Sequence, residues 1–193
     1  MTRVGRFVLV RHGESEGNRD RVFTHTPDVS LTGTGREQAR AAAALIAGRY
    51  KPTRLVASPF VRAQQTAQII AEVLQLTVET ESAFREQSFG RLAGEPYDAL
   101  LVDPTYHCTP RWEWRAPGGE SLLDVYARVA PAFEQLAKAG DGQDIVLVSH
   151  GGVMLALSAY LTGSWETAAI TPNAGIVVVE HKNGTFQRPC SIL

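Results

Sequence analysis

Two histidines stand in similar settings, each after a short apolar run and before glycine. The sequence Arg11-His12-Gly13 follows the run Phe7–Val10, and Ser149-His150-Gly151-Gly152 follows Ile145–Val148. Glycine lets backbone N–H groups approach an anion closely. Two of the five histidines in the chain are therefore placed where an anionic ligand could be bound.

A phosphate monoester is an anion for which such histidines would be useful. Its uncatalysed hydrolysis is among the slowest known reactions, and a covalent intermediate on histidine divides the reaction into two easier steps. The phosphate oxygens then need fixed positive partners, which arginine supplies with matching geometry. The leaving alkoxide needs a proton from a general acid. If arginines supply the charge, no metal ion is required.

The chain offers side chains for each of these tasks. His12 is the candidate nucleophile, and Glu86, after Phe84-Arg85, is the candidate acid. The other candidates could bind phosphate by charge or by hydrogen bonds: Arg11, Arg62, His150 (as a positive donor if protonated), Asn18 and Thr24.

Short β-branched runs predict the strands that would position these residues. Phe7–Val10, Arg54–Ala57 and Ile145–Val148 fit strands that are buried on both faces. Helical patterns alternate with them, which predicts a three-layer α/β/α sandwich with a mostly parallel central sheet. Ligands of such sheets bind beyond the carboxyl ends of the strands, where the candidate residues lie.

Local signals predict where the helices begin. Thr34 and Glu37 have the spacing of a capping box, so a helix over Arg36–Tyr50 should begin near Thr32–Gly35. Ser58 as N-cap and Pro59 at the first helical position should begin the next helix. Gly119–Lys138 and 153–161 read as two further helices.

The remaining segments carry weaker signals. Leu76–Val78 and Ala83–Phe84 are weak strand candidates, and 87–118 is irregular, as substrate-covering loops often are. Asn183-Gly184 between Gly175–Val179 and Thr185–Gln187 predicts a hairpin.

Length and composition bound the class of protein. The 193 residues predict one domain over 1–193, and a net charge of −1 gives no general attraction to nucleic acid or to an acidic membrane. The apolar stretch Val153–Leu161 is too short for a membrane span, and Cys108 and Cys190 lack metal-ligand spacing. We expect a cytoplasmic protein.

An ordered set of motifs resembles the histidine phosphatase superfamily, also called the phosphoglycerate mutase-like family. The set covers nearly the whole chain: Arg11-His12-Gly13-Glu14-Ser15, Asn18, Leu31-Thr32, Gly35, Ala57-Ser58-Pro59, Arg62-Ala63, Gln65-Thr66-Ala67, Arg85-Glu86, Pro117–Ser121 and Val148–Gly152. His25 stands where many members have glycine, and Gly90–Gly94 departs from the usual pattern after the glutamate.

The resemblance implies a role for each candidate. His12 becomes phosphohistidine, and Arg11, Arg62 and His150 form the phosphate pocket around it. Glu86 protonates the leaving group and later activates water. The resemblance also makes Asn18 a pocket contact and places Thr24 where a small polar phosphate contact is common.

Three functions remain open at this stage. The favoured one is a metal-independent and cofactor-free phosphatase that acts on a small phosphorylated metabolite, because mutases of the family are longer. The alternatives are a phosphoglycerate mutase, an isomerase that would use 2,3-bisphosphoglycerate, and a non-catalytic phospho-ligand or protein-binding module. The oligomeric state is open, with a homodimer as one option.

Six further side chains receive a prediction. Arg111 and Arg115 could bind a second anionic group or lie in solvent, and an inward orientation would favour a mutase or bisphosphatase. His107 and His181 are expected at the surface. Of Trp112 and Trp114, which alternate, one should pack inward while the other faces a substrate.

Overall fold

The structure is a computed structural model. It describes residues 4–24, 26–140, 142–182, 185–187 and 189–191. His25 and the predicted Asn183-Gly184 turn lie outside the described residues.

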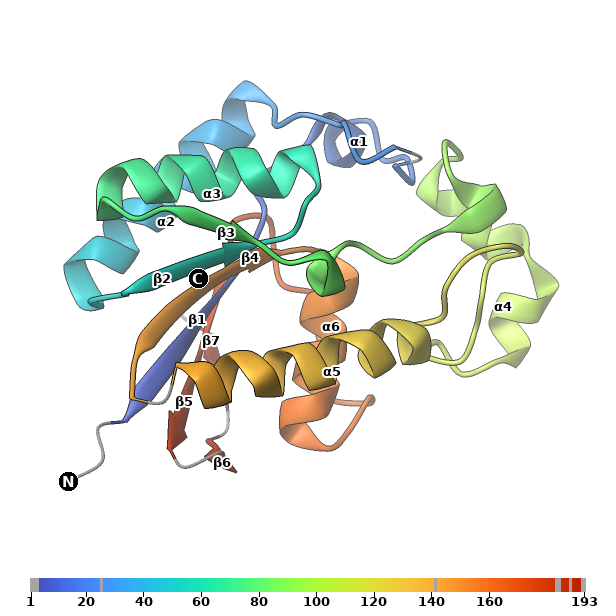
Figure 1. Ribbon diagram of the computed structural model, residues 1–193. Helices are drawn as coiled ribbons and strands as arrows, with labels where there is room; N and C mark the ends of the chain where they lie inside the picture. The colour runs from blue at the N-terminus through green and yellow to red at the C-terminus, as the bar shows by residue number, and fades with distance from the viewer. Residues whose placement is uncertain (1–3, 25, 141, 183–184, 188, 192–193) are drawn as a thin grey trace.

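A mixed, mostly parallel sheet forms the centre of the molecule (Figure 1). Its strand order is β3-β2-β4-β1-β5-β6, with β7 beside β5. The strands β1, β2, β3 and β4 are parallel, whereas β5 is antiparallel to β1. Their bounds are Gly5–Arg11 (β1), Arg54–Ala57 (β2), Val78–Thr80 (β3), Asp144–Ser149 (β4), Ile176–Lys182 (β5), Thr185–Phe186 (β6) and Cys190–Ser191 (β7).

Helices cover both faces of this sheet, which confirms the predicted α/β class. In Figure 1, α2 and α3 lie on one side of the strands, and α5 and α6 lie on the other. The helices are α1 (Glu16–Arg19), α2 (Gly33–Arg49), α3 (Val61–Leu74), α4 (Pro104–Cys108), α5 (Leu122–Ala139) and α6 (Gly151–Thr162).

Strand β1 shows how one segment holds the two layers together. Val8 and Val10 belong to the core cluster that includes α2 and α3, while Phe7 and Leu9 belong to the cluster that includes α5 and α6. All four side chains are buried. Successive side chains of a strand point to opposite faces, so the continuous apolar run reflects burial on both.

Two predicted helix caps are wrong. The N-cap of α2 is Thr32 rather than Thr34, and its hydroxyl accepts the Gly35 N–H at 3.0 Å. Ser58 does not cap α3, whose N-cap is Phe60. The Ser58 N–H donates to the Val148 carbonyl at 3.1 Å and extends the β2–β4 ladder by one residue, and the Ser58 hydroxyl is hydrogen-bonded to His150 Nε2 at 2.6 Å.

Three weaker predictions also need correction. Ala83–Phe84 lies in a 3-10 helix, Ser82–Phe84, and not in a strand. Strand β3 begins at Val78, two residues after Leu76, which instead packs against the core between the sheet and α2 and α3. His181 is buried rather than exposed, because it lies on β5 against the ring of Phe7.

The segment 87–118 extends beyond the carboxyl ends of the parallel strands (Figure 1). It contains the 3-10 helices Gly90–Leu92 and Tyr97–Val102, followed by the short helix α4. Backbone hydrogen bonds attach it to the loop after α1: the Phe23 N–H donates to the Glu95 carbonyl at 2.8 Å, and the Tyr97 N–H donates to the Arg21 carbonyl at 2.9 Å. The segment is therefore fixed beside the loop that follows His12.

Candidate active site

The adjacency of β1 and β4 brings the two glycine-flanked histidines together. Arg11 pairs with Ser149 in the parallel register, so the next residues, His12 and His150, leave the sheet side by side. The His12 N–H donates to the Ser149 carbonyl at 2.9 Å, and the two imidazole centroids are 5.2 Å apart. The convergence expected from the sequence is present in the structure.

The ring of His12 is held in one tautomer. Its Nδ1 lies 2.7 Å from the Gly13 carbonyl oxygen, which can only accept, so Nδ1 carries the hydrogen and Nε2 carries the lone pair. The Arg62 Nε–H donates to Nε2 at 3.2 Å. Both side chains are buried. The lone pair of His12 thus points toward the arginine pocket.

The surroundings of His12 keep this ring neutral. Burial is the largest effect, and together with the charges of Arg62 and Arg11 it lowers the pKa of His12 well below its ordinary value of 6.5. The hydrogen bond to Gly13 acts in the opposite direction and is weaker. His12 is therefore unprotonated at neutral pH, as a nucleophile must be.

The two arginines have N–H groups with no protein partner. Arg11 Nη1 donates to the Thr171 carbonyl at 2.7 Å, but Arg11 Nε and Arg62 Nη1 are buried without a hydrogen-bond partner among the described residues. Burial lowers the pKa of both guanidinium groups, while Glu86 raises it. Buried charges require a partner, and these unpaired donors are directed to an anion such as phosphate.

His150 lies behind His12 rather than in the cavity wall. Its Nε2 is 2.6 Å from Ser58 Oγ, and its Nδ1 is buried without a partner in the described part of the chain. Burial, followed by the charge of Arg62, lowers the pKa of His150 well below 6.5, so the unliganded protein holds it neutral. The expected positive charge is therefore absent in this state, although Nδ1–H can still donate a hydrogen bond.

Glu86 is attached to the start of α6. Its Oε1 accepts the Gly152 N–H at 3.0 Å and the Gln87 N–H at 2.9 Å. A Cβ at position 152 would lie 2.7 Å from Oε1, so the close approach requires glycine. Oε1 is occupied by these backbone donors, and Glu86 lines the same cavity as His12.

Asn18 joins three parts of the site. Its Oδ1 accepts from Asn173 Nδ2 at 3.0 Å, and its Nδ2 donates to the Tyr97 hydroxyl at 3.2 Å. Asn173 Nδ2 also donates to the His12 carbonyl at 3.2 Å. Asn173 and Tyr97 were not predicted, and no local pattern could indicate them, because these contacts join residues far apart in the sequence.

A cavity of about 510 Å³ opens in front of His12. The charged and polar side chains of its wall include His12, Arg11, Arg62, Glu86, Asn18, Thr24 and Arg111, and the rest of the wall is largely aromatic and aliphatic: Val22, Phe23, Phe89, Tyr97, Leu100, Tyr106, Trp114, Leu122, Leu155 and Ile170. Much of this apolar wall comes from the segment 87–118. The site can therefore hold a molecule that carries both an anionic group and a larger, less polar group.

The structure places Arg111 and Arg115, whose positions the sequence left open, in different surroundings. Arg111 lines the cavity, whereas Arg115 forms an ion pair of 2.7 Å with Asp124 at the surface. The two tryptophans are separated as well. Trp114 is buried in the cavity wall, and Trp112 stacks on Trp165 with 6.3 Å between the ring centroids.

The described residues lack both a metal-binding cluster and a membrane-spanning helix. They contain no group of three or more His, Cys, Asp or Glu side chains arranged to hold a metal ion. They also contain no helix with the length and apolar character needed to cross a membrane.

Comparison with known proteins extends these observations. The family model of the histidine phosphatase superfamily (branch 1) matches residues 7–188. The chain is 36% identical over 169 residues to a 2,3-bisphosphoglycerate-dependent phosphoglycerate mutase of Methylobacterium radiotolerans, covering 82% of this chain and 80% of that protein. It is 34% identical over 171 residues to a glucosyl-3-phosphoglycerate phosphatase of Mycolicibacterium vanbaalenii, covering 83% and 76%.

A solved structure shows the same architecture. The native structure of a mycobacterial glucosyl-3-phosphoglycerate phosphatase superposes with a TM-score of 0.85 at 29% identity, covering 99% of this chain and 98% of that one. The fold and family that the motifs predicted are confirmed. This chain belongs to the histidine phosphatase superfamily, branch 1.

Proposed function

We propose that this protein is a phosphatase that hydrolyses phosphate monoesters of small metabolites through a phosphohistidine at His12. One observation carries the proposal: His12, whose Nε2 carries the lone pair, lines the same cavity as Arg11 and Arg62, and each arginine has a buried N–H without a partner among the described residues. A nucleophile and an anion-binding pocket therefore occupy the same place.

The reaction has two steps. His12 Nε2 attacks phosphorus, the bond from phosphorus to the ester oxygen breaks, and protonated Glu86 gives its proton to that oxygen. Glu86, now a carboxylate, then takes a proton from water as the water attacks phosphorus. The bond from phosphorus to Nε2 breaks, which returns inorganic phosphate and free His12.

The other site residues stabilise charge in both steps. Arg11 and Arg62 bind the phosphate oxygens, and the Nδ1–H of His150 adds a donor from behind His12. Asn18 holds the loop after His12 and contributes its amide at the edge of the pocket, while Thr24 offers a hydroxyl there. These donors are fixed before substrate arrives, which is how preorganised sites lower a barrier.

A mutase is the second candidate, and one observation favours it. Arg111 lines the cavity and could bind the carboxylate of a phosphoglycerate, and relatives named as mutases are as similar to this chain as relatives named as phosphatases. The largely apolar wall favours the phosphatase, because a phosphoglycerate has little apolar surface to bury against it. A non-catalytic binding module is disfavoured because every proposed catalytic side chain is present.

Four further expectations belong to this proposal. The protein acts as one domain over 1–193 in the cytoplasm, and it needs neither metal nor cofactor. Its partner is a small phosphorylated metabolite.

The test is the replacement His12→Ala. It should abolish phosphate release from p-nitrophenyl phosphate in the presence of EDTA and prevent acid-labile labelling by a radioactive substrate. The matched control is His107→Ala, since His107 is exposed and does not line the cavity. Normal turnover in His12→Ala would contradict the nucleophile assignment. A parallel assay with 3-phosphoglycerate and 2,3-bisphosphoglycerate distinguishes a mutase.

A further inference from the structure

Arg128 on α5 binds the backbone that carries Glu86. Its Nη1 donates to the Ala83 carbonyl at 2.7 Å and to the Arg85 carbonyl at 2.9 Å, and its Nη2 donates to the Glu86 carbonyl at 3.2 Å. The Arg128 side chain is only 15% exposed. One guanidinium group thus holds three carbonyls within four residues of the chain.

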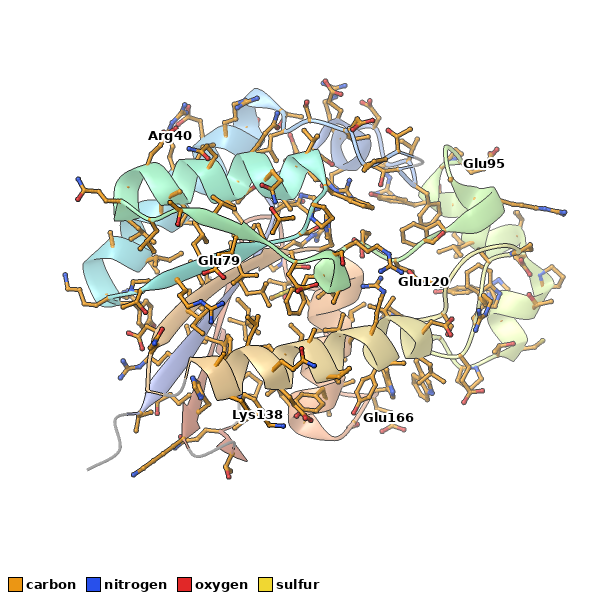
Figure 2. All side chains as sticks on the ribbon, viewed as in Figure 1. Arg40, Glu79, Glu95, Glu120, Lys138 and Glu166 are labelled. Carbon is orange, nitrogen blue, oxygen red and sulfur yellow. The ribbon has the colours of Figure 1, made fainter. Side chains whose placement is uncertain are left out.

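Glu120, which Figure 2 labels near the start of α5, pairs with Arg128. Its Oε1 accepts from Arg128 Nε and its Oε2 from Arg128 Nη2, both at 3.0 Å, which is the two-bond geometry of a strong arginine–carboxylate pair. Oε2 also accepts the Ser88 N–H at 3.0 Å. The pair therefore binds the chain on both sides of Glu86.

The charge state of Glu120 suits this role. Burial by itself raises the pKa of Glu120. The hydrogen bonds from Arg128 and from the Ser88 N–H lower the pKa, and together the lowering effects outweigh burial, so the pKa lies below its ordinary value. Glu120 stays ionised at neutral pH and keeps Arg128 oriented.

The segment 85–88 belongs to no strand and lies between the 3-10 helix Ser82–Phe84 and the next one at Gly90. Several of its other hydrogen bonds also go to Glu120: Arg85 Nη2 donates to Glu120 Oε1 at 3.1 Å, Gln87 Nε2 donates to the Glu120 carbonyl at 2.7 Å, and the Glu120 N–H donates to the Ser88 carbonyl at 2.8 Å. Beyond these, the Arg85 N–H donates to the Ser82 carbonyl at 3.2 Å, and the Glu86 carboxylate accepts the Gly152 N–H at 3.0 Å. The position of the Glu86 carboxyl group over Gly152 depends on how this irregular backbone is held.

We infer that Arg128 and Glu120 are positioning residues that hold Glu86 where it can pass a proton to the leaving oxygen. The inference rests on the proposed function, in which Glu86 is the acid. Neither residue is in the cavity wall, so neither is expected to touch the substrate. A displacement of about 1 Å in a catalytic group can cost on the order of 100-fold in rate.

The test is Arg128→Lys, which keeps the charge but cannot bind three carbonyls and a carboxylate at once. For an alkyl phosphate, whose leaving group needs a proton, kcat should fall about 10- to 100-fold, in line with the size of general acid catalysis. For p-nitrophenyl phosphate, whose leaving group is stable as an anion, kcat should change less than about threefold, and KM should change little for either substrate.

Arg115→Lys is the matched control. Arg115 also forms an ion pair with a carboxylate at the start of α5, Asp124, but this pair makes no contact with the segment that carries Glu86. Its kinetics should equal those of the unchanged protein with both substrates. Circular dichroism and melting temperature show whether each variant is folded. If Arg128→Lys does not fold, Glu120→Gln, which weakens the same pair, is used in its place.

A double-mutant cycle of Arg128→Lys and Glu86→Gln distinguishes a failure of this inference from a failure of the proposed function. If Arg128 acts through Glu86, the selective loss with alkyl phosphates disappears when Glu86 is already Gln. An equal loss with both substrates, or losses that multiply in the double variant, would overturn the inference while leaving Glu86 as the acid. If Glu86→Gln alone causes no selective loss, the acid role fails and the positioning role falls with it, while labelling of His12 still tests the nucleophile.

Discussion

Ser58 Oγ lies 2.6 Å from Nε2 of His150, and both side chains are fully buried. The Ser58 oxygen also accepts the Phe60 N–H at 3.3 Å, which leaves its hydrogen and one lone pair available to Nε2. When the hydroxyl donates to Nε2, a neutral His150 carries its hydrogen on Nδ1, the nitrogen that the proposed function uses as a donor to phosphate. The Ser58 hydroxyl, just after β2, is thus the partner through which the tautomer of His150 can be tested.

The change Ser58→Ala tests this relationship. Without the hydroxyl, Nε2 has no partner, and His150 can place its hydrogen on either nitrogen. We expect kcat/KM for p-nitrophenyl phosphate to fall about 5- to 30-fold, which corresponds to about 1–2 kcal/mol for the loss of a buried hydrogen bond. Nitrogen chemical shifts of the histidine rings report the tautomer directly. An unchanged tautomer in Ser58→Ala would contradict the assignment.

Replacement of Arg62 by lysine should show that its planar group is required. Lysine keeps the charge but loses the paired N–H geometry, so kcat/KM should fall about 100- to 1,000-fold, as when one donor to a transition-state oxygen is removed. Arg40→Lys on α2 is the control, because Arg40 is exposed and forms an ion pair with Glu37 at the surface. Similar activities in the two variants would exclude Arg62 from the phosphate pocket.

The buried histidines predict how stability depends on pH. The pKa of His12 and of His150 lies well below 6.5 in the folded protein, while both are near 6.5 in the unfolded chain. As pH falls below 6.5, the unfolded chain binds protons that the folded one does not. The free energy of unfolding therefore decreases, by at most about 1.4 kcal/mol per pH unit for each histidine.

Urea unfolding of His150→Gln between pH 7 and pH 5 measures this effect. Its free energy of unfolding should vary less steeply with pH than that of the unchanged protein. The difference in slope should be at most about 1.4 kcal/mol per pH unit, which corresponds to one bound proton. His107→Gln serves as the control because His107 is exposed, and it should retain the full slope. A slope that His150→Gln leaves unchanged would show that His150 is not held neutral.

Two glycines of α2 should respond in opposite ways to alanine. A Cβ at Gly35 would collide with the Glu14 carbonyl oxygen, whereas a Cβ at Gly48 would meet nothing within 4 Å. Gly35→Ala should destabilise the protein by about 1–3 kcal/mol, as overpacking does, and displace the loop that follows His12. Gly48→Ala should stabilise it by about 0.5–1 kcal/mol through helix propensity.

Thermal and urea unfolding measure both changes. Each variant is the control for the other, because the two positions share one helix and one substitution. Equal effects on stability would mean that helix α2 does not approach the loop after His12 as closely as the structure shows.

Periodicity and strand chemistry are enough to predict the layers of this fold. The runs at Phe7–Val10 and Ile145–Val148 are apolar on both faces, so their burial in a parallel sheet follows from composition alone. The location of His12 and His150 at the same edge of the sheet also follows, whereas their side-by-side position depends on the pairing of β1 with β4. The layers and the shared edge are consequences of local sequence, which is why they could be found without a structure.

Other features depend on contacts that the sequence does not display. Ser58 is a residue type that favours helix caps, but its hydroxyl is hydrogen-bonded to His150, 92 residues away in the chain, and α3 begins after Phe60. His181 reads as a polar surface residue, yet β5 turns it toward Phe7. Arg128 and Asn173 act through partners far away in the chain, and no spacing rule reveals such partners.

The cavity joins two regions of different origin. Strand ends and helix starts supply His12, Arg11 and Arg62, whereas the segment 87–118, which contributes no strand to the sheet, supplies much of the apolar wall. Substitutions in that wall can change which phosphate monoester fits, by its alcohol part, without moving the side chains that bind and attack the phosphate. The two regions can diverge at separate rates, and a single chemical centre can then serve relatives that differ in the compound they accept.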